Sequence, residues 1–368
     1  MLWLPAAGTL ALALYMGLWP VPIDPVAWDA PAAPGYTGAH AVNSKLANAR
    51  RIDLHGEVGP EHVLAGPDGK LYTGLLSGNI VRMQPDGSGQ EVFAATGGRP
   101  LGMAFAADGS LVVADAIKGL LSVAPGGQVS ALGDGQARFL NAVAIGAGGK
   151  LYVTESSTRF LPAVHGGTVE AAMLDVMEQS ATGRVLEYDP ASKALREVAR
   201  GFSLANGIAL SGDGTSLFVS ESGRYRVWKI ATDADRLDVG TPSAQAQRLF
   251  DKLPGYPDNL TRAPDGRLWL GFGGPRNELD KMARTPFLRS MVLRIPRFLW
   301  AAPKPYGHVM AFSEDGKVLD DLQDPGGQSP LTTGATDIGA RLYIHNADGN
   351  TLDWLERSPT SAAAGTGK

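Results

Sequence analysis

The chain has 368 residues, of which 47 are glycine and 25 are proline, so about one residue in five interrupts regular structure. This composition excludes long helices and coiled coils. Hydrophobic residues make up 44 % of the chain and the formal net charge is −4, which excludes a disordered chain. No Lys/Arg-rich run is present, which argues against nucleic acid as a partner. The absence of cysteine excludes disulfides, thiolate metal sites and thiol nucleophiles.

The N-terminal segment, residues 1–23, contains no charged side chain. Its apolar run from Leu2 to Trp19 would form a helix about 27 Å long, close to the ~30 Å core of a bilayer. We therefore expect an uncleaved membrane anchor, with a cleaved secretory signal or a buried segment as alternatives. The first two readings both export the rest of the chain, to a periplasmic or other extracytoplasmic location or, after cleavage, as a secreted protein. Residues 24–48, rich in Ala, Pro and Gly, are expected to be a linker.

The body of the chain repeats one turn-and-strand unit. The clearest copies are PDGKLYTG, ADGSLVVA, GGKLYVTE, GDGTSLFVSE and PDGRLWLG, whose turns begin at residues 68, 108, 148, 213 and 265. A sixth, weaker copy is GARLYIHN at 339–346. A period of about 40 to 50 residues with several strands per repeat is typical of a β-propeller blade. We predict one all-β domain, a six-bladed β-propeller over residues 49–357, followed by a disordered tail at 358–368.

Two inserts stretch the period. Residues 167–179 have helical spacing and lie between the third and fourth copies. Residues 277–303 mix five basic residues with Leu, Phe, Met and Trp. We expect short helices in both. The second insert is predicted to form a cap over one face of the propeller or, alternatively, a basic amphipathic element that rests on anionic lipid.

Counting seven residues back from the five turns identifies an equivalent position in each blade. The residues found there are Glu61, Leu101, Asn141, Asn206 and Asp258, with Asn259 next to the last. Equivalent starts of inner strands converge on the axis of a propeller, so these side chains are expected to meet. Two carboxylates and two or three amides form an all-oxygen set of formal charge −2, which suits Ca²⁺ better than zinc. A lone Asn at a strand start is more often a turn residue, but the shared register favours a metal site.

The motifs around these residues resemble a known family. GGRPLGMAF, FLNAVAI, GFSLANGIALSGDGTSLFVSES and LPGYPDNLTRAPDGRLWLGF are similar to segments of strictosidine synthase-like proteins, over roughly residues 57–345. The wider superfamily contains paraoxonases and gluconolactonases, all six-bladed propellers. The resemblance implies a Ca²⁺-dependent ester or lactone hydrolase, with the metal held by Glu61, Asn141, Asn206, Asp258 and Asn259.

The chain also departs from its relatives. The catalytic histidine of paraoxonases corresponds to Leu101, and His62 replaces an acidic residue tied to their second calcium, so neither feature is expected here. The glutamate of the plant alkaloid synthase corresponds to Asp337, which makes strictosidine synthesis improbable. His308 shares the seven-residue offset from a later turn, but we place it on an outer hairpin.

Three hypotheses follow. The first is an enzyme in which Ca²⁺ polarises the carbonyl of a small lactone or ester while Asp258 acts as ligand and base. The second is a non-catalytic binding or scaffold propeller that calcium stabilises. The third is condensation chemistry at Asp337.

Overall fold

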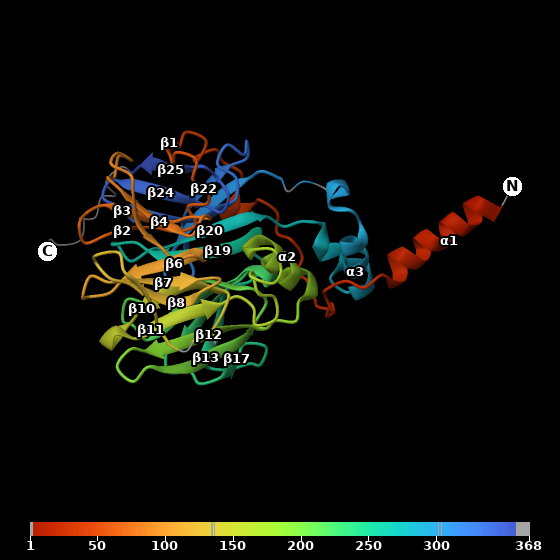
Figure 1. Ribbon diagram of the computed structural model, residues 1–368, viewed down its shortest axis with the longest axis horizontal. Coiled ribbons are helices and arrows are strands. Elements are labelled where there is room, and N and C mark those ends of the chain that lie inside the picture. The colour runs from red at the N-terminus through yellow and green to blue at the C-terminus, as the bar shows by residue number, and fades with distance from the viewer. Residues whose placement is uncertain (1–2, 134, 136, 301, 303, 358–368) are drawn as a thin grey trace.

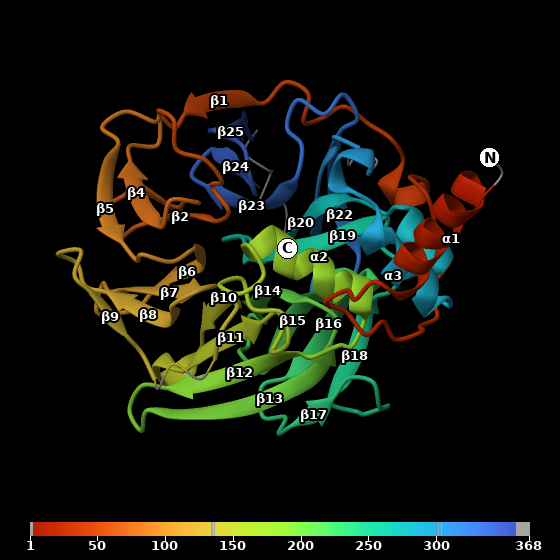
Figure 2. The same ribbon diagram turned by 45° about the vertical axis from the view of Figure 1, so that its right-hand side comes forward.

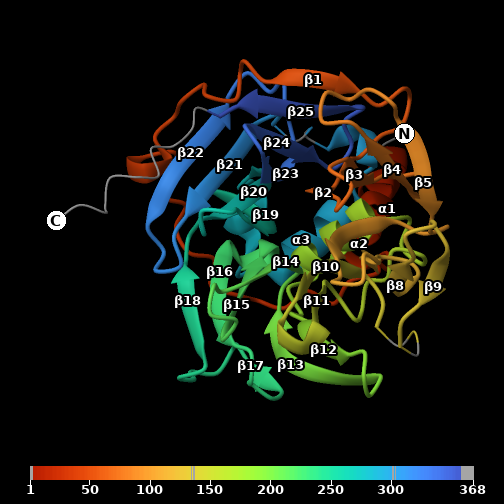
Figure 3. The same cartoon turned by 90° about the vertical axis from the view of Figure 1, so that its left-hand side faces the viewer.

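The computed structural model describes residues 3–133, 135, 137–300, 302 and 304–357. Within these residues, antiparallel strands form six blades around a common axis, as Figure 3 shows, which confirms the predicted propeller. Four blades are separate sheets. The fifth and sixth share one sheet because Phe272 pairs with Thr332 at their junction. The predicted tail lies outside the described residues.

Each blade runs from an innermost strand to an outer edge. In chain order the strands of the blades are β2 (Val63–Ala65), β3 (Leu71–Gly74), β4 (Asn79–Met83) and β5 (Glu91–Ala95); β6 (Pro100–Phe105), β7 (Leu111–Asp115), β8 (Gly119–Val123) and β9 (Val129–Ala131); β10 (Leu140–Ile145), β11 (Leu151–Glu155), β12 (Gly183–Asp189) and β13 (Ala194–Phe202); β14 (Ala205–Leu210), β15 (Ser216–Glu221), β16 (Arg226–Ala231) and β18 (Ala246–Phe250); β19 (Gly255–Arg262), β20 (Leu268–Pro275), β21 (Gly307–Phe312) and β22 (Val318–Asp324); and β23 (Thr332–Ile338), β24 (Arg341–Asn346), β25 (Thr351–Glu356) and β1 (Arg50–Asp53). The short strand β17 (Leu237–Asp238) pairs in parallel with β13.

The ring is closed by strands from opposite ends of the chain. β1 pairs antiparallel with β25 and forms the outer edge of the sixth blade, with Ile52 opposite Leu352. Both of these side chains are buried in the same apolar cluster. Packing between neighbouring blades is apolar and includes fully buried aromatic residues such as Trp269 and Phe312.

The repeated turns have the local chemistry that their sequence predicts. Gly69 and Gly109 have φ values of 76° and 81°, which an L side chain rarely adopts. The aspartate before each glycine caps the turn: Asp68 accepts a hydrogen bond from the backbone of Lys70, and Asp108 accepts one from Ser110. These turns fix where each inner strand ends and therefore which residues face the axis.

The inserts form helices on one side of the ring. α2 (Thr168–Glu178) lies across one end of the axis, and α3 (Pro286–Arg294) packs beside it, flanked by the 3₁₀ turns η4 (Glu278–Met282) and η5 (Arg297–Leu299). Figures 1 and 2 show α1 (Trp3–Leu18) projecting from this same side. Apolar residues of α2 and α3 share a cluster with Ile23 and Trp300, so the expected helical cap is present.

The N-terminal helix does not meet the length expected of an anchor. α1 has 16 residues, and in the described part of the chain no helix is both long and apolar enough to cross a membrane. The membrane-spanning helix predicted from the sequence is therefore not supported. Residues 24–48 were expected to be a linker, but they lie against the propeller: Val26 bonds to the backbone of Glu178, and Leu46 is buried against blade five.

Candidate metal site on the propeller axis

The predicted register is found in the structure. Leu101, Asn141 and Asn206 are each the second residue of an innermost strand. Glu61 lies two residues before β2, and Asp258 lies within β19. All five line one cavity of about 340 Å³ at the end of the axis covered by α2.

Bulges in the inner strands position the polar side chains. The pairing of β10 with β11, of β14 with β15 and of β19 with β20 shifts register at Asn141, Asn206 and Asp258 respectively. A bulge re-aims side chains and frees backbone groups next to a site. Gly207 lets β14 approach β19, because a Cβ atom there would lie 2.3 Å from the backbone nitrogen of Leu260.

The donor atoms fit a hard cation. Asn141 Oδ1, Asn206 Oδ1 and Asp258 Oδ1 are buried and have no hydrogen-bond partner among the described residues. Three unpartnered oxygens in one small cavity are costly for a folded protein unless a ligand satisfies them. Their chemistry, with the Glu61 carboxylate beside them, matches the oxygen set that Ca²⁺ takes.

The two carboxyl groups have perturbed acidities. Burial and the neighbouring Glu61 raise the pKa of Asp258 well above its ordinary value. Burial also raises the pKa of Glu61, although Arg99 and Asn259 oppose this shift. A bound cation would favour the ionised form of both groups.

Two residues of the predicted set are placed differently from the others. Asn259 is buried, but its amide donates to the backbone oxygen of Glu61 at 3.0 Å, and it does not line the cavity. Its role as a ligand stays a prediction. Asp337 lies toward the end of β23, where it accepts hydrogen bonds from Trp269 (2.7 Å) and Arg357 (3.1 Å). It does not line the cavity either, so its position does not support condensation chemistry there.

The histidines occupy other places. His62 faces the opposite end of the axis, where its ring lies 5.3 Å from that of His345 and burial lowers its pKa to about 4. His308 lies on β21, the third strand of blade five, as the outer-hairpin prediction required.

Arg99 was missed by sequence reasoning. Its guanidinium lines the cavity, lies 3.3 Å from the Glu61 carboxylate and donates to the backbone oxygen of Gly59 at 2.9 Å. The residue belongs to the GGRPLG motif, and nothing in that motif indicates that the arginine pairs with Glu61 of the preceding blade.

Hydroxyl groups behind the cavity were also missed. Thr154 Oγ1 on β11 accepts a hydrogen bond from the backbone nitrogen of Ala142 (3.0 Å) and donates to the carbonyl of Asn206. In the next blade, Ser220 Oγ on β15 accepts a hydrogen bond from the backbone nitrogen of Gly207 (2.7 Å) and donates to the carbonyl of Asp258. Each hydroxyl satisfies the free N–H of a bulge and fixes the strand that carries the next polar residue. Thr154 and Ser220 occupy the same position in the segments LYVTES and LFVSES, and this shared hydroxyl position could have indicated their role.

The wall of the cavity changes character along its length. The inner end is polar, whereas the side toward α2 is apolar and includes Phe139, Met173, Val176, Leu204 and Leu279. Such a site favours a small ligand with a polar group at its inner end and an apolar portion toward the mouth.

Fold and site together define a six-bladed propeller with a cluster of buried oxygen donors at one end of its axis. The family described as SMP-30/Gluconolactonase/LRE-like region matches residues 65–277, and Strictosidine synthase-like, N-terminal matches residues 38–83. The chain belongs to the strictosidine synthase-like family of these propellers.

Similar proteins agree with this assignment. The adipocyte plasma membrane-associated protein of Danio rerio is 29 % identical over 88 % of this chain and 81 % of its own length. Protein STRICTOSIDINE SYNTHASE-LIKE 10 of Arabidopsis thaliana is 30 % identical over 81 % of this chain and 84 % of its own. Among solved structures, a gluconolactonase from Xanthomonas campestris superposes with a TM-score of 0.57 at 18 % identity, covering 90 % and 98 % of the two chains. The calcium-binding protein regucalcin from Agrobacterium tumefaciens gives 0.56 at 15 % identity, covering 84 % and 93 %. These two similarities support the assignment of the fold.

Proposed function

We propose that the chain is a calcium-dependent hydrolase of lactones or small esters. The observation that carries the proposal is the convergence of Asn141 Oδ1, Asn206 Oδ1 and Asp258 Oδ1, all buried and unpartnered, on one cavity with an apolar outer wall. The gluconolactonase named above has the same fold, which supports the choice of reaction class.

The residues at the axial cavity have separate roles in this proposal. Glu61, Asn141, Asn206 and Asp258 would hold the ion, and Asn259 fixes the backbone at Glu61. Bound Ca²⁺ supplies a Lewis acid that polarises the ester carbonyl. Asp258, ionised beside the cation, would orient a water molecule and accept its proton as the water attacks the carbonyl.

The apolar wall contributes binding and excludes water. Phe139, Leu204 and Met173 surround the space where the acyl chain or ring carbons of the substrate would lie. This arrangement selects substrates that are apolar on one side of the carbonyl.

The test compares hydrolysis of lactones and aryl esters by the full-length chain in Ca²⁺ and in EGTA. We expect chelation to abolish turnover and Glu61→Gln to lower it by about a hundredfold or more. Glu314→Gln, on a distant turn, is the matched control and should retain activity. Turnover that is indifferent to both EGTA and Glu61→Gln would exclude the proposal. If Ca²⁺ raises the melting temperature but no ester or lactone is hydrolysed, the protein is a non-catalytic binding or scaffold propeller in which calcium is only structural.

We further propose that the propeller works at a membrane surface, on the side that carries α2 and α3. Large apolar side chains are exposed there, including Phe298 at 85 %, Leu299 at 63 % and Phe287 at 54 %. Leu18 at the end of α1 and Trp19 after it are also exposed, and Arg294 of α3 donates hydrogen bonds to the backbone oxygens of Met16 and Trp19. The name of the Danio rerio relative supports a membrane association. Export of the propeller stays a prediction.

Flotation with vesicles of anionic and neutral lipid tests this placement. The double variant Phe298→Ser/Leu299→Ser should float several-fold less than the wild type. The control is Leu319→Ser, because Leu319 is exposed on β22, outside this surface. Equal flotation of both variants would exclude the surface as a membrane contact.

A further inference from the structure

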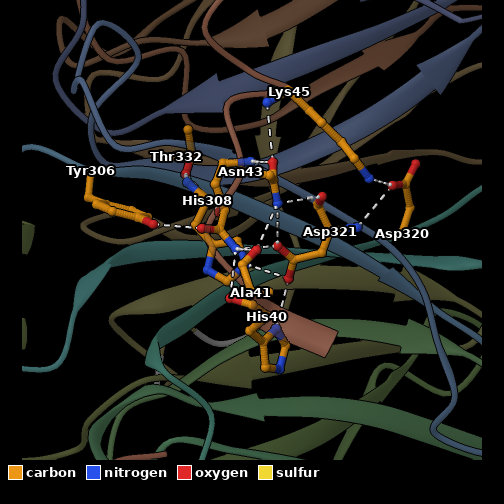
Figure 4. A network of polar contacts seen from close by, with 10 residues as sticks. His40, Ala41, Asn43, Lys45, Tyr306, His308, Asp320, Asp321 and Thr332 are labelled. Carbon is orange, nitrogen blue, oxygen red and sulfur yellow. Dashed lines mark hydrogen bonds and ion pairs between the residues drawn. The ribbon is translucent and has the colours of Figure 1, made fainter. Parts of the chain in front are cut away.

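A second group of metal-binding side chains lies on blade five, outside the axial cavity. Figure 4 shows His40, from the segment before β1, next to His308 of β21 and Asp321 of β22. Asp321 Oδ2 lies 2.7 Å from His40 Nδ1 and 2.8 Å from His308 Nε2. His308 and Asp321 are buried, whereas the side chain of His40 is 15 % exposed. Three ligand atoms thus meet within 4.8 Å at the edge of the fold.

Surrounding groups hold the three side chains in place. Gln323 donates from its amide to Asp321 Oδ1, and its own oxygen accepts a hydrogen bond from Tyr306 at 2.6 Å. The ring of His308 stacks on Phe272 with centroids 4.1 Å apart. A layer of contacts of this kind orients ligands in metal sites.

Two polar atoms beside the cluster lack partners. The Tyr36 hydroxyl and His308 Nδ1 are both buried and make no hydrogen bond within the described residues. Tyr36 lies close to the cluster, since its ring centroid is 5.6 Å from that of His308 and the charge of Asp321 contributes to the raised pKa of the phenol. A water molecule on a bound ion would give the Tyr36 hydroxyl a partner.

We propose that His40, His308 and Asp321 bind a divalent transition-metal ion of the zinc type and thereby fasten the N-terminal segment to blade five. Two imidazoles and one carboxylate are ligands that Zn²⁺ and Co²⁺ accept, whereas Ca²⁺ prefers oxygen alone. Tetrahedral coordination separates neighbouring ligand atoms by about 3.3 Å, so the carboxylate oxygen has to withdraw by about 0.5 Å. His40 is partly exposed and gives an ion access from solvent.

The competing explanation is a hydrogen-bonded clamp that binds no metal. Titration of the chelator-stripped full-length chain with Co²⁺ separates the two, because tetrahedral Co²⁺ with nitrogen ligands has visible absorption bands. We expect one Co²⁺ per chain, displaced by Zn²⁺ and not by Ca²⁺. His40→Asn should weaken binding at least tenfold, and Zn²⁺ should raise the melting temperature of the wild type but not of this variant.

Three variants control the experiment. His55→Asn removes an exposed histidine elsewhere and should leave Co²⁺ binding unchanged. Asp258→Asn alters the axial cavity and should weaken Ca²⁺ binding while the Co²⁺ bands persist, so failure of this proposal is distinguishable from failure of the proposed function. Asp321→Asn keeps hydrogen-bonding capacity but removes the charge, and it should lose Co²⁺. Absence of the bands in the wild type, or bands that survive both His40→Asn and Asp321→Asn, would overturn the proposal.

Discussion

Arg99 and Glu61 form a buried ion pair in the wall of the axial cavity, with 3.3 Å between Nη2 and Oε2 and side-chain exposures of 4 % and 9 %. The fixed positive charge lies beside the group that is predicted to bind a cation. It keeps Glu61 paired when no ion is bound, and it lowers the net negative charge that an incoming ion meets.

Replacing Arg99 by Met should therefore destabilise the protein most when calcium is absent. Breaking a buried pair leaves one uncompensated charge and costs about 3 to 5 kcal/mol. We expect a marked drop in melting temperature in EGTA, and a smaller drop in saturating Ca²⁺ because the ion then pairs with Glu61. Thermal denaturation under both conditions measures this. Arg248→Met, at an exposed arginine, should change neither value. An equal drop with and without Ca²⁺ would show that Arg99 acts independently of the ion.

Calcium binding should release protons through Asp258. Burial and Glu61 raise the pKa of this carboxyl, so a fraction of the ion-free protein carries a proton there at pH values where an ordinary Asp is ionised. Binding requires the carboxylate, so affinity falls as the pH is lowered. Calorimetry in two buffers of different ionisation enthalpy measures the protons released. Asn141→Ala should weaken binding without changing this number, whereas Asp258→Asn should reduce it. Identical heats in both buffers would contradict the assignment.

Thr154 is predicted to be a positioning residue for Asn206. Its hydroxyl joins the bulge at Ala142 to the carbonyl of Asn206 in the next blade. Thr154→Val should weaken Ca²⁺ binding by about tenfold while the circular dichroism spectrum stays that of the wild type. Thr154→Ser keeps the hydroxyl and should restore the affinity. A Val variant with wild-type affinity would show that the hydroxyl contributes only to packing.

Asp175 of α2 should make stability depend on pH. Burial raises its pKa to about 7, above the ordinary value of 3.8. The folded protein thus binds this proton more tightly than the unfolded chain does. The stability is complete below pH 4 and is lost as the pH rises to about 7, by roughly 1.4 kcal/mol per unit at most. Denaturant unfolding in EGTA across pH 4 to 8 measures the slope. Asp175→Asn should flatten it, and Glu170→Gln, on the same helix, should not. An unchanged slope in Asp175→Asn would assign the dependence to Glu61 and Asp258.

The sequence predicted the parts of the site that repeat. Asn141, Asn206 and Asp258 could be found because five of the six blades carry a clear copy of the same turn, and a turn at a fixed distance places the inner strand in register. The contacts of Arg99 with Glu61 and of Thr154 with Asn206 could not be predicted from the repeated turns. Glu61 lies in another blade from Arg99, and Asn206 lies in another blade from Thr154, so each contact depends on how blades pack.

The contacts of the N-terminal region could not be predicted from composition. Composition predicted a spanning helix and a linker at residues 24–48, but α1 ends at Leu18 and the segment that follows packs on the propeller. Its contacts depend on single residues such as His40, which meets Asp321 across 281 positions of sequence. No local pattern marks such a residue.

The pairing of β1 with β25 has a consequence for biosynthesis. Arg50 lies opposite Trp354, so β1 has no partner in the sixth blade until β25, 304 positions later, has been synthesised. The sixth blade therefore cannot be completed before β25 has left the ribosome, and the strands β23, β24 and β25 must then capture β1. A protein cut short after β24 would leave β1 as an unpaired edge strand, free to join the sheet of another molecule.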